Sequence, residues 1–398
     1  MTLSIYLAQV LLVVVMAQLL LLRKSWILRS QTFLWGIAVA VIAIRYGITD
    51  QLNFYSNDQR FHVQVVMSVA EQFTPIDLDW ISTGRLPFVL PGWVLYAFGL
   101  SPTLALKTVS LVCLLRLTDT ILKVARPATT GSSMRIAILT ACGTMGVFFS
   151  SLALRETMMM LVTTRLMLSR SLPNKLVLFL IMFLLRSHLA VSLAAAYLLV
   201  TLWKTFRNKR EEGVISTVCL LSFSSTCGYL LYSLGQSRLF GVQVFGHSWG
   251  IEPVTRIISN YVGLQFLTVN SETIQQSITT LLLLRLVLFE TVLVPTLFTW
   301  LVLTRPHLLS IDETIMMVGF AIYVGLVTNT DFNSFRQNIP FMPVMGLCAI
   351  TILNRSKSKA DNEWILLSPA YDRELLASAS GVDERGVKDW NSVTRVTQ

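Results

Sequence analysis

The sequence predicts an all-α polytopic membrane protein with about 10–11 transmembrane or half-membrane helices, because long apolar runs fill most of it. Hydrophobic residues make up 54% of the 398 residues and charged residues only 14%. The mean hydropathy is +0.63. A soluble domain typically has about 25% charged residues. Apolar runs of roughly 17–25 residues are long enough to cross a bilayer.

The basic residues predict the orientation of these helices. They gather in short segments between apolar runs, as expected for loops on the cytoplasmic side of a membrane. This pattern explains the net charge of +10 without a nucleic-acid partner. It predicts a multi-pass membrane protein with an outer N-terminus and a cytoplasmic C-terminus. The one N-x-S/T sequon, Asn354-Arg355-Ser356, falls on the predicted inner side, which fits a location in a bacterial inner membrane. The predicted spans are 3–22, 31–49, 103–123, 134–152, 155–169, 214–235, 280–303, 312–330 and 338–354.

The same pattern predicts two parts of the chain. Residues 1–354 form a transmembrane domain, which contains all of the candidate catalytic residues named below, and residues 355–398 form a polar cytoplasmic tail. Two large loops, at about 50–102 and 236–279, are expected on the outer face. Membrane lipids are therefore expected partners of the first part.

One segment does not fit a simple count of spans. Residues 175–203 are flanked by basic residues at both ends, so this segment is expected to leave and return to the same face. It is too short for two full spans and long for one. The preferred interpretation is two short helices that meet at Arg186-Ser187-His188. The alternative is one long tilted helix.

Polar clusters fall where the apolar runs are expected to reach the outer face. Ionisable residues at such positions are costly and are candidates for function. Their shared face predicts a common polar site. The clusters are Asp58-Gln59-Arg60-Phe61-His62, Arg155-Glu156, Arg186-Ser187-His188 and Asp331 to Gln337.

Asp58 is the first candidate for a catalytic carboxylate. It follows the second predicted span, in a segment rich in aromatic and hydrogen-bonding side chains, and a general base must stay ionised near neutral pH. Arg60 and His62 are placed to support it, His62 at i+4 on the same helix face. The alternative is that Asp58 only caps a helix predicted over 59–73. Asp50 is the second candidate carboxylate.

Several arginines on one face predict an anion site. Arginine forms bidentate hydrogen bonds to phosphate and stays protonated, so Arg155, Arg186 and Arg336 are candidates to bind a diphosphate. Gln337 follows Arg336, and Glu156 is a supporting partner of Arg155. The alternative is that each arginine pairs locally or extends to solvent.

His188 is expected to orient a phosphate or move a proton, with a structural histidine as the alternative. The sequence contains no convincing metal-binding motif, and no metal or other cofactor is predicted. Asp77-Leu78-Asp79 has the spacing of two metal ligands, but such a pair also occurs by chance in acidic loops.

Three stretches resemble bacterial O-antigen and exopolysaccharide polymerases of the Wzy and EpsG-like type, within the GT-C-type glycosyltransferase group. They are Arg45-Tyr46-Gly47 followed by Phe54 to Asp58, Ser150 to Glu156, and Asn333 to Pro340 with Pro343. The break at Leu184 to His188 is similar to one in GT-C folds. A glycine that often precedes the acid in EpsG-like chains is missing from 53–58.

The resemblance implies a GT-C-like fold and polymerisation of polyprenyl-diphosphate-linked saccharide units at the outer face. Asp58 would be the base and the arginines would hold the diphosphate. A chain-length regulator is a possible partner. Two alternatives remain open: a GT-C-type transferase that adds one sugar from a lipid-linked donor, and a non-enzymatic flippase or transporter of an anionic lipid-linked saccharide.

Overall fold

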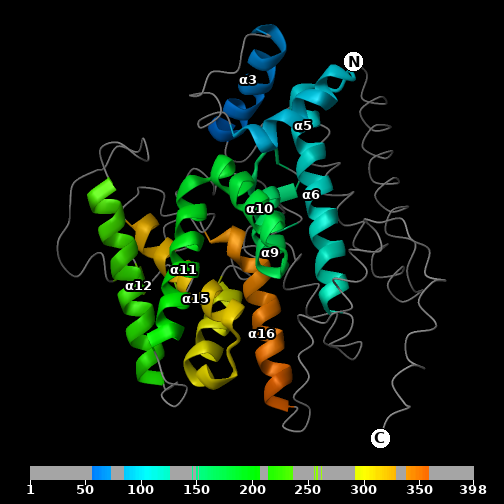
Figure 1. Cartoon of the computed structure of the whole chain (residues 1–398). Helices are drawn as coiled ribbons and strands as arrows, with labels where there is room; N and C mark the ends of the chain where they lie inside the picture. Colours follow the sequence, from blue (N-terminus) through cyan, green and yellow to red (C-terminus); the bar gives the residue numbers. More distant parts are fainter. Residues whose placement is uncertain are drawn as a thin grey trace, which may run out of the picture.

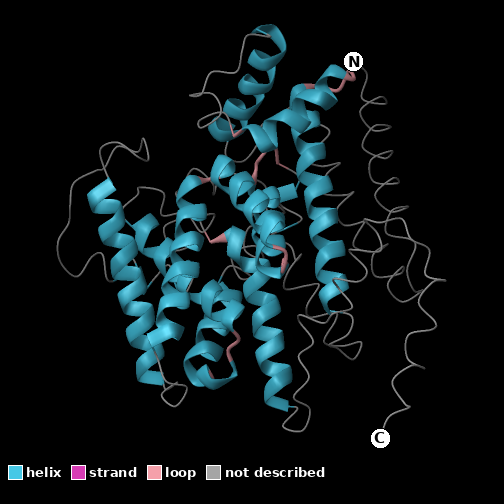
Figure 2. Cartoon of the chain, viewed as in Figure 1, coloured by secondary structure: helices cyan, strands magenta, loops and turns pink. Residues whose placement is uncertain are grey.

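Helices account for nearly all of the described structure. The computed structural model describes residues 56–72, 85–125, 146, 149–150, 152–206, 214–235, 255, 257–258, 261, 292–328 and 338–357. Figure 1 shows their arrangement, and Figure 2 shows helices joined by short loops within these ranges. The elements are α3 (Ser56–Gln72), α5 (Leu86–Ala97), α6 (Pro102–Ala125), α9 (Glu156–Leu168), α10 (Leu172–Leu185), α11 (Ser187–Phe206), α12 (Val214–Gly235), η4 (Pro306–Leu308), α15 (Ile311–Thr328), η6 (Ile339–Phe341) and α16 (Met342–Lys357).

The predicted break within 175–203 is confirmed. Helix α10 ends at Leu185, and α11 begins at Ser187. Between them Arg186 has an extended backbone, with φ −162° and ψ 94°. Neither glycine nor proline stands at this point in the sequence. Contacts from other helices therefore have to hold the break, because local sequence does not impose it.

Helices α3, α5 and α6 form one end of the molecule. α3 and α5 lie at the top of Figure 1, beside the first turns of α6, and α3 packs against both. α6 continues downward and packs along α9. Buried apolar side chains, including Val66, Phe88 and Leu106, fill the space between α3, α5 and α6. The N-terminal ends of α3 and α5 thereby face the segment that leads into α9.

Helices α12 and α15 cross in very close contact. Small residues make this possible, since Gly228 lies against the carbonyl of Ile322 and Gly325 lies against the carbonyl of Ser225. α15 also packs on α11. Its first turn is closed by a capping box, in which the Ser310 N–H donates to Glu313 Oε2 (2.7 Å) and the Glu313 N–H donates to Ser310 Oγ (3.2 Å). The core next to this crossing is aromatic and contains the buried Tyr323.

The predicted membrane fold is contradicted. Across the described ranges, every helix falls short of the combined length and apolar character that crossing a membrane requires. α9 has 13 residues and α10 has 14, and 14 residues rise only about 21 Å against a hydrocarbon core of about 30 Å. The longer α6 has charged residues at Lys107, Arg116, Asp119 and Lys123. The predictions of a polytopic membrane protein and of a multi-pass inner-membrane location are therefore wrong.

Several predicted helices exist even so. The ranges 103–123, 155–169, 214–235 and 312–330 correspond to α6, α9, α12 and α15, and the helix predicted over 59–73 is α3. Within the outer loop predicted at about 50–102, only the 59–73 helix was expected, and α5 was not. α16 continues to Lys357, past the predicted boundary at 354. The spans 3–22 and 31–49, most of 134–152, most of the loop 236–279 and the tail after 357 lie outside the described residues.

Adding a methyl group at Gly325 is expected to destabilise the protein by about 1–3 kcal/mol, because it would press on the Ser225 carbonyl and force two backbones apart. Urea unfolding of Gly325→Ala measures this. Gly319→Ala on the same helix is the matched control, since its added carbon meets a movable side-chain end, Leu193 Cδ2, at 2.8 Å. Equal loss in both variants would show that the α12–α15 crossing is not tight at Gly325.

Candidate functional site

The site is built around the break between α10 and α11. Arg155 is the N-cap residue of α9, and its Nη1 donates to the carbonyl of Leu185, the last residue of α10. The last carbonyls of a helix have no partner within the helix and carry partial negative charge. The guanidinium therefore satisfies the end of α10 and ties the start of α9 to the break.

Arg186 is the residue at the break, and its side chain contacts His188 in the first turn of α11. Arg186 Nε donates to His188 Nε2 at 2.8 Å. The His188 ring stacks on Tyr323 of α15, with ring centroids 5.8 Å apart and an interplanar angle of 16°. The Arg186 guanidinium also lies over the Tyr323 ring, at 5.8 Å from its centroid. Tyr323 is a buried platform that fixes both side chains.

His188 stays neutral near physiological pH. Burial lowers the pKa of His188 well below 6.5, and the charges of Arg186, Arg155 and Arg85, in that order, lower it further. By solvent-accessible area, Arg85, Arg155, Arg186 and His188 are each partly buried residues. Because Arg186 donates to Nε2, the ring proton is on Nδ1. The site is therefore a gathering of three guanidinium groups around a neutral imidazole.

Helix α3 is docked on the segment that leads into Arg155. The Ala153 N–H donates to Gln59 Oε1 at 2.9 Å, and His62 Nδ1 is 3.0 Å from the Ala153 carbonyl. Arg85 Nη1 lies 2.8 Å from His62 Nε2. Arginine has no acceptor, so Nε2 accepts and the His62 proton is on Nδ1, from which it is donated to Ala153. Both backbone groups of one residue are thus held by α3.

Arg85 has an unusual backbone for its residue type. It precedes α5 with φ 53° and ψ 43°, the left-handed conformation, which costs a non-glycine residue about 1–2 kcal/mol. Its guanidinium lies over Phe61, at 5.0 Å from the ring centroid. Such strain persists where surrounding contacts fix the backbone, and it concentrates at functional sites.

The structure brings together part of the predicted site. Arg155, Arg186 and His188 converge, and Glu156 is buried at the first position of α9. Asp58 is half-buried in the first turn of α3, one residue before Gln59. α3 begins at Ser56, so Asp58 is inside the helix and not the residue before it. His62 is buried and positions Arg85, whereas Arg60 is exposed. Asp50, Arg336 and Gln337 lie outside the described residues.

Sequence reasoning missed Arg85 and Tyr323. The run Thr83-Gly84-Arg85-Leu86-Pro87 contains a glycine and a proline that mark a turn into a helix. An arginine at the start of a helix could therefore have been predicted from the sequence, but its proximity to His188 could not. Tyr323 looks like any aromatic residue in an apolar run, because only the packing of α11 on α15 reveals its contact with His188.

The chemistry available at this site is the binding of an anion. Guanidinium groups bind phosphate through paired hydrogen bonds, and His188 adds a neutral N–H donor. Among the residues that the structure describes, no group of three or more His, Cys, Asp or Glu side chains gathers closely enough to hold a metal ion. Comparison with known proteins found no matching family model, no matching curated protein and no matching solved structure.

Replacing Gln59 is expected to weaken both folding and the site. Gln59→Met has a similar volume but no acceptor, so it leaves the buried Ala153 N–H without this bond and should cost about 1–3 kcal/mol in the free energy of unfolding. Chemical denaturation measures the cost. Gln64→Met, at an exposed position of the same helix, is the control, and equal effects would argue against the docking of α3 through Gln59.

Acidification is expected to destabilise the protein through His188. Above about pH 6.5 the ring is neutral in both the folded and the unfolded state. Below it the unfolded chain binds a proton that the folded chain excludes, so the free energy of unfolding falls toward the depressed folded pKa. This group should contribute a loss of about 1 kcal/mol between pH 7.5 and 5.5.

Urea unfolding at the two pH values measures this loss. His188→Gln should show a smaller decrease than the wild type, because glutamine accepts from Arg186 without titrating. His307→Gln, at an exposed histidine in η4, should keep the wild-type decrease. If His188→Gln loses as much free energy of unfolding between the two pH values as the wild type does, the neutral His188 ring is contradicted.

Proposed function

We propose that the protein is a glycosyltransferase that uses a polyprenyl-diphosphate-linked saccharide and joins saccharide repeat units into a polymer. The observation that supports this most directly is a set of guanidinium groups around the α10–α11 break: Arg186 donates to His188, and Arg155 donates to the Leu185 carbonyl. Arg85 lies near enough to act on the pKa of His188 by its charge. A leaving diphosphate gains negative charge as its bond to the sugar breaks. Fixed guanidinium groups stabilise such charge without having to reorganise.

The reaction proposed here has a simple balance. An acceptor sugar hydroxyl attacks the anomeric carbon of the donor, and the bond between that carbon and the phosphate oxygen breaks. The hydroxyl proton passes to the carboxylate of Asp58, and both bonding electrons leave with the diphosphate. Asp58 immediately precedes Gln59, whose side chain accepts from the N–H of Ala153, two residues before Arg155.

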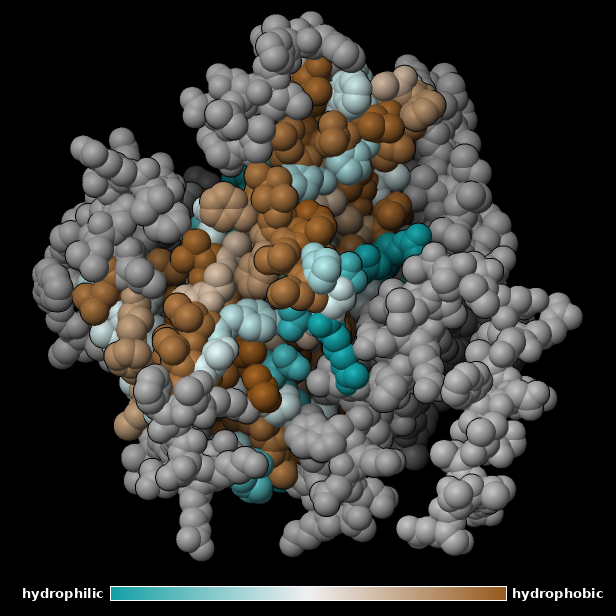
Figure 3. Space-filling view, viewed as in Figure 1, coloured by the Kyte–Doolittle hydropathy of each residue, from teal (hydrophilic) through white to brown (hydrophobic). Residues whose placement is uncertain are grey.

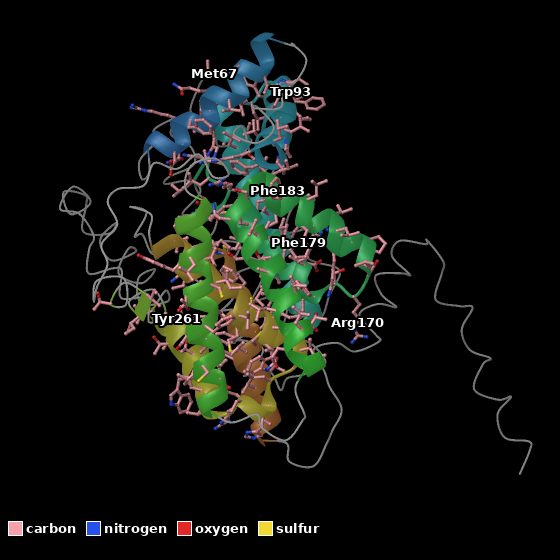
Figure 4. The ribbon with its side chains drawn as sticks, turned by 60° about the vertical axis from the view of Figure 1, so that its left-hand side comes forward. Met67, Trp93, Arg170, Phe179, Phe183 and Tyr261 are labelled. Carbon is pink, nitrogen blue, oxygen red and sulfur yellow. The ribbon has the colours of Figure 1, made fainter. Side chains whose placement is uncertain are left out.

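The surface beside the arginines supports a donor with a hydrocarbon chain. The outer face of α10 is an apolar stripe, and five of its large hydrophobic residues are half to two-thirds exposed: Leu172, Leu176, Val177, Leu180 and Phe183. Brown apolar atoms gather across this face in Figure 3, and Figure 4 shows Phe183 near the α3 end of the helix. The stripe ends one turn before Arg186. A chain attached to a diphosphate bound there has apolar surface next to it.

Substitution of Asp58 tests the proposed transfer. The purified full-length protein is given a polyprenyl-diphosphate-linked saccharide, and the products are read by mass. Asp58→Asn keeps the shape of the side chain but removes the base, so turnover should fall about 10²–10⁴-fold. Asp312→Asn is the matched control, because Asp312 is also a half-buried aspartate in the first turn of a helix.

The product masses separate the possible results. A ladder of repeat units that Asp58→Asn abolishes and Asp312→Asn keeps would agree with the proposal. A single added sugar would contradict polymerisation and leave transfer standing. Full activity in Asp58→Asn would show that Asp58 is not the base. If the wild-type protein forms no product, the proposed function is wrong.

A further inference from the structure

We infer that Arg85 binds the phosphate that is bonded to the transferred saccharide, whereas Arg155 and Arg186 bind the phosphate further from it. This inference rests on the proposed function and adds to it a residue with a separate role. The evidence is the anchoring of each guanidinium, the element that carries it and the backbone of Arg85.

Each of the three guanidinium groups is anchored to a different neighbour. Arg155 is held by the Leu185 carbonyl, Arg186 by His188 and Tyr323, and Arg85 by His62 and Phe61. Like charges repel, and these anchors keep the groups from collapsing onto one point. Three separately held guanidinium groups carry more paired donors than a single phosphate can use, and a diphosphate can use more of them.

The anchors also indicate which end of a bound substrate lies near which arginine. Arg155 and Arg186 belong to the junction of α9, α10 and α11, next to the apolar stripe of α10. Arg85 is held by His62, which lies one helical turn after Asp58 on α3. A saccharide next to Asp58 is therefore on the Arg85 side of the diphosphate, and a lipid chain is on the Arg186 side.

The backbone of Arg85 indicates that its placement is specific. It is the one residue other than glycine with positive φ in the described ranges. Surface arginines have many ordinary ways to reach solvent, and none requires a left-handed backbone. Here the conformation directs the side chain to His62, whose ring is fixed by Ala153. His62 is thus a positioning residue for Arg85.

This placement predicts different kinetic roles for the arginines. Negative charge develops on the oxygen that the sugar leaves, so a cation at that phosphate acts mainly in the transition state and raises kcat. Cations at the distal phosphate bind substrate and transition state alike, so they mainly lower KM. The two effects are separable by measurement.

The test uses the full-length protein and two variants of Arg85. Arg85→Asn removes the charge and keeps a residue type that tolerates the left-handed backbone, and Arg85→Lys keeps the charge but loses the fork of donors. Arg170→Gln is the control, because Arg170 is exposed and lies away from the α3 end in Figure 4. Turnover is measured with the lipid-linked donor, and binding is measured calorimetrically with inorganic pyrophosphate and inorganic phosphate.

We expect Arg85→Asn to lower kcat about 100-fold or more with little change in KM. It should weaken pyrophosphate binding about tenfold, because one guanidinium–phosphate contact is lost. Arg85→Lys should recover part of kcat, and Arg170→Gln should match the wild type. Arg155→Gln and Arg186→Gln should instead raise KM.

The test distinguishes a wrong role for Arg85 from a wrong proposed function. If Arg155→Gln and Arg186→Gln weaken pyrophosphate binding but Arg85→Asn changes neither binding nor kcat, the role of Arg85 is refuted and the proposed function stands. If Arg155→Gln, Arg186→Gln and Arg85→Asn all leave pyrophosphate binding unchanged, the diphosphate site and the proposed function both fail.

Discussion

The hydrogen bond from Arg155 to the carbonyl of Leu185 fixes where α10 ends and where α11 begins. Residues 172–206 contain no internal glycine, and their one proline is in the first turn of α10, so local preference would allow one continuous helix through Arg186. A continuous helix would turn Arg186 and His188 away from their present neighbours. The break therefore creates the site, and the cation at the end of α10 stabilises the break.

The arginines also determine which ring nitrogen carries the proton in His62 and in His188. Arg186 and Arg85 can only donate, so Nε2 of His188 and of His62 accepts, and each ring carries its single proton on Nδ1. In His62 this proton is used to hold Ala153. In His188 the same tautomer leaves an N–H donor beside three cations, which suits a phosphate oxygen better than it suits proton transfer near neutral pH.

Much of the helical pattern could be predicted from the sequence, because apolar runs and basic flanks mark α6, α9, α12 and α15. The break at Arg186 was also predicted, but from a count of membrane spans that the structure contradicts. The membrane fold could not be inferred safely, because apolar runs such as α9 and α10 look alike whether they pack in a protein core or against lipid. Their ends, after 13 and 14 residues, depend on turns at Ser169 and Arg186.

The candidate site also contains residues that the sequence predicted and residues that it did not. Arg155, Arg186 and His188 were predictable because charged groups in apolar surroundings are uncommon. Arg85 precedes α5, a helix that was not predicted, and its contact with His62 depends on how α3 and α5 pack. Tyr323 contacts His188 only because α15 lies along α11. Long-range packing of this kind leaves no local signal in the sequence.

The decisive experiment is a crystal structure of the full-length protein with inorganic pyrophosphate. We expect an extended residue at Arg186, with Arg155 on the Leu185 carbonyl, and phosphate oxygens about 2.7–2.9 Å from guanidinium nitrogens of Arg155, Arg186 and Arg85. A continuous helix through Arg186, or pyrophosphate bound away from these three residues, would contradict this arrangement.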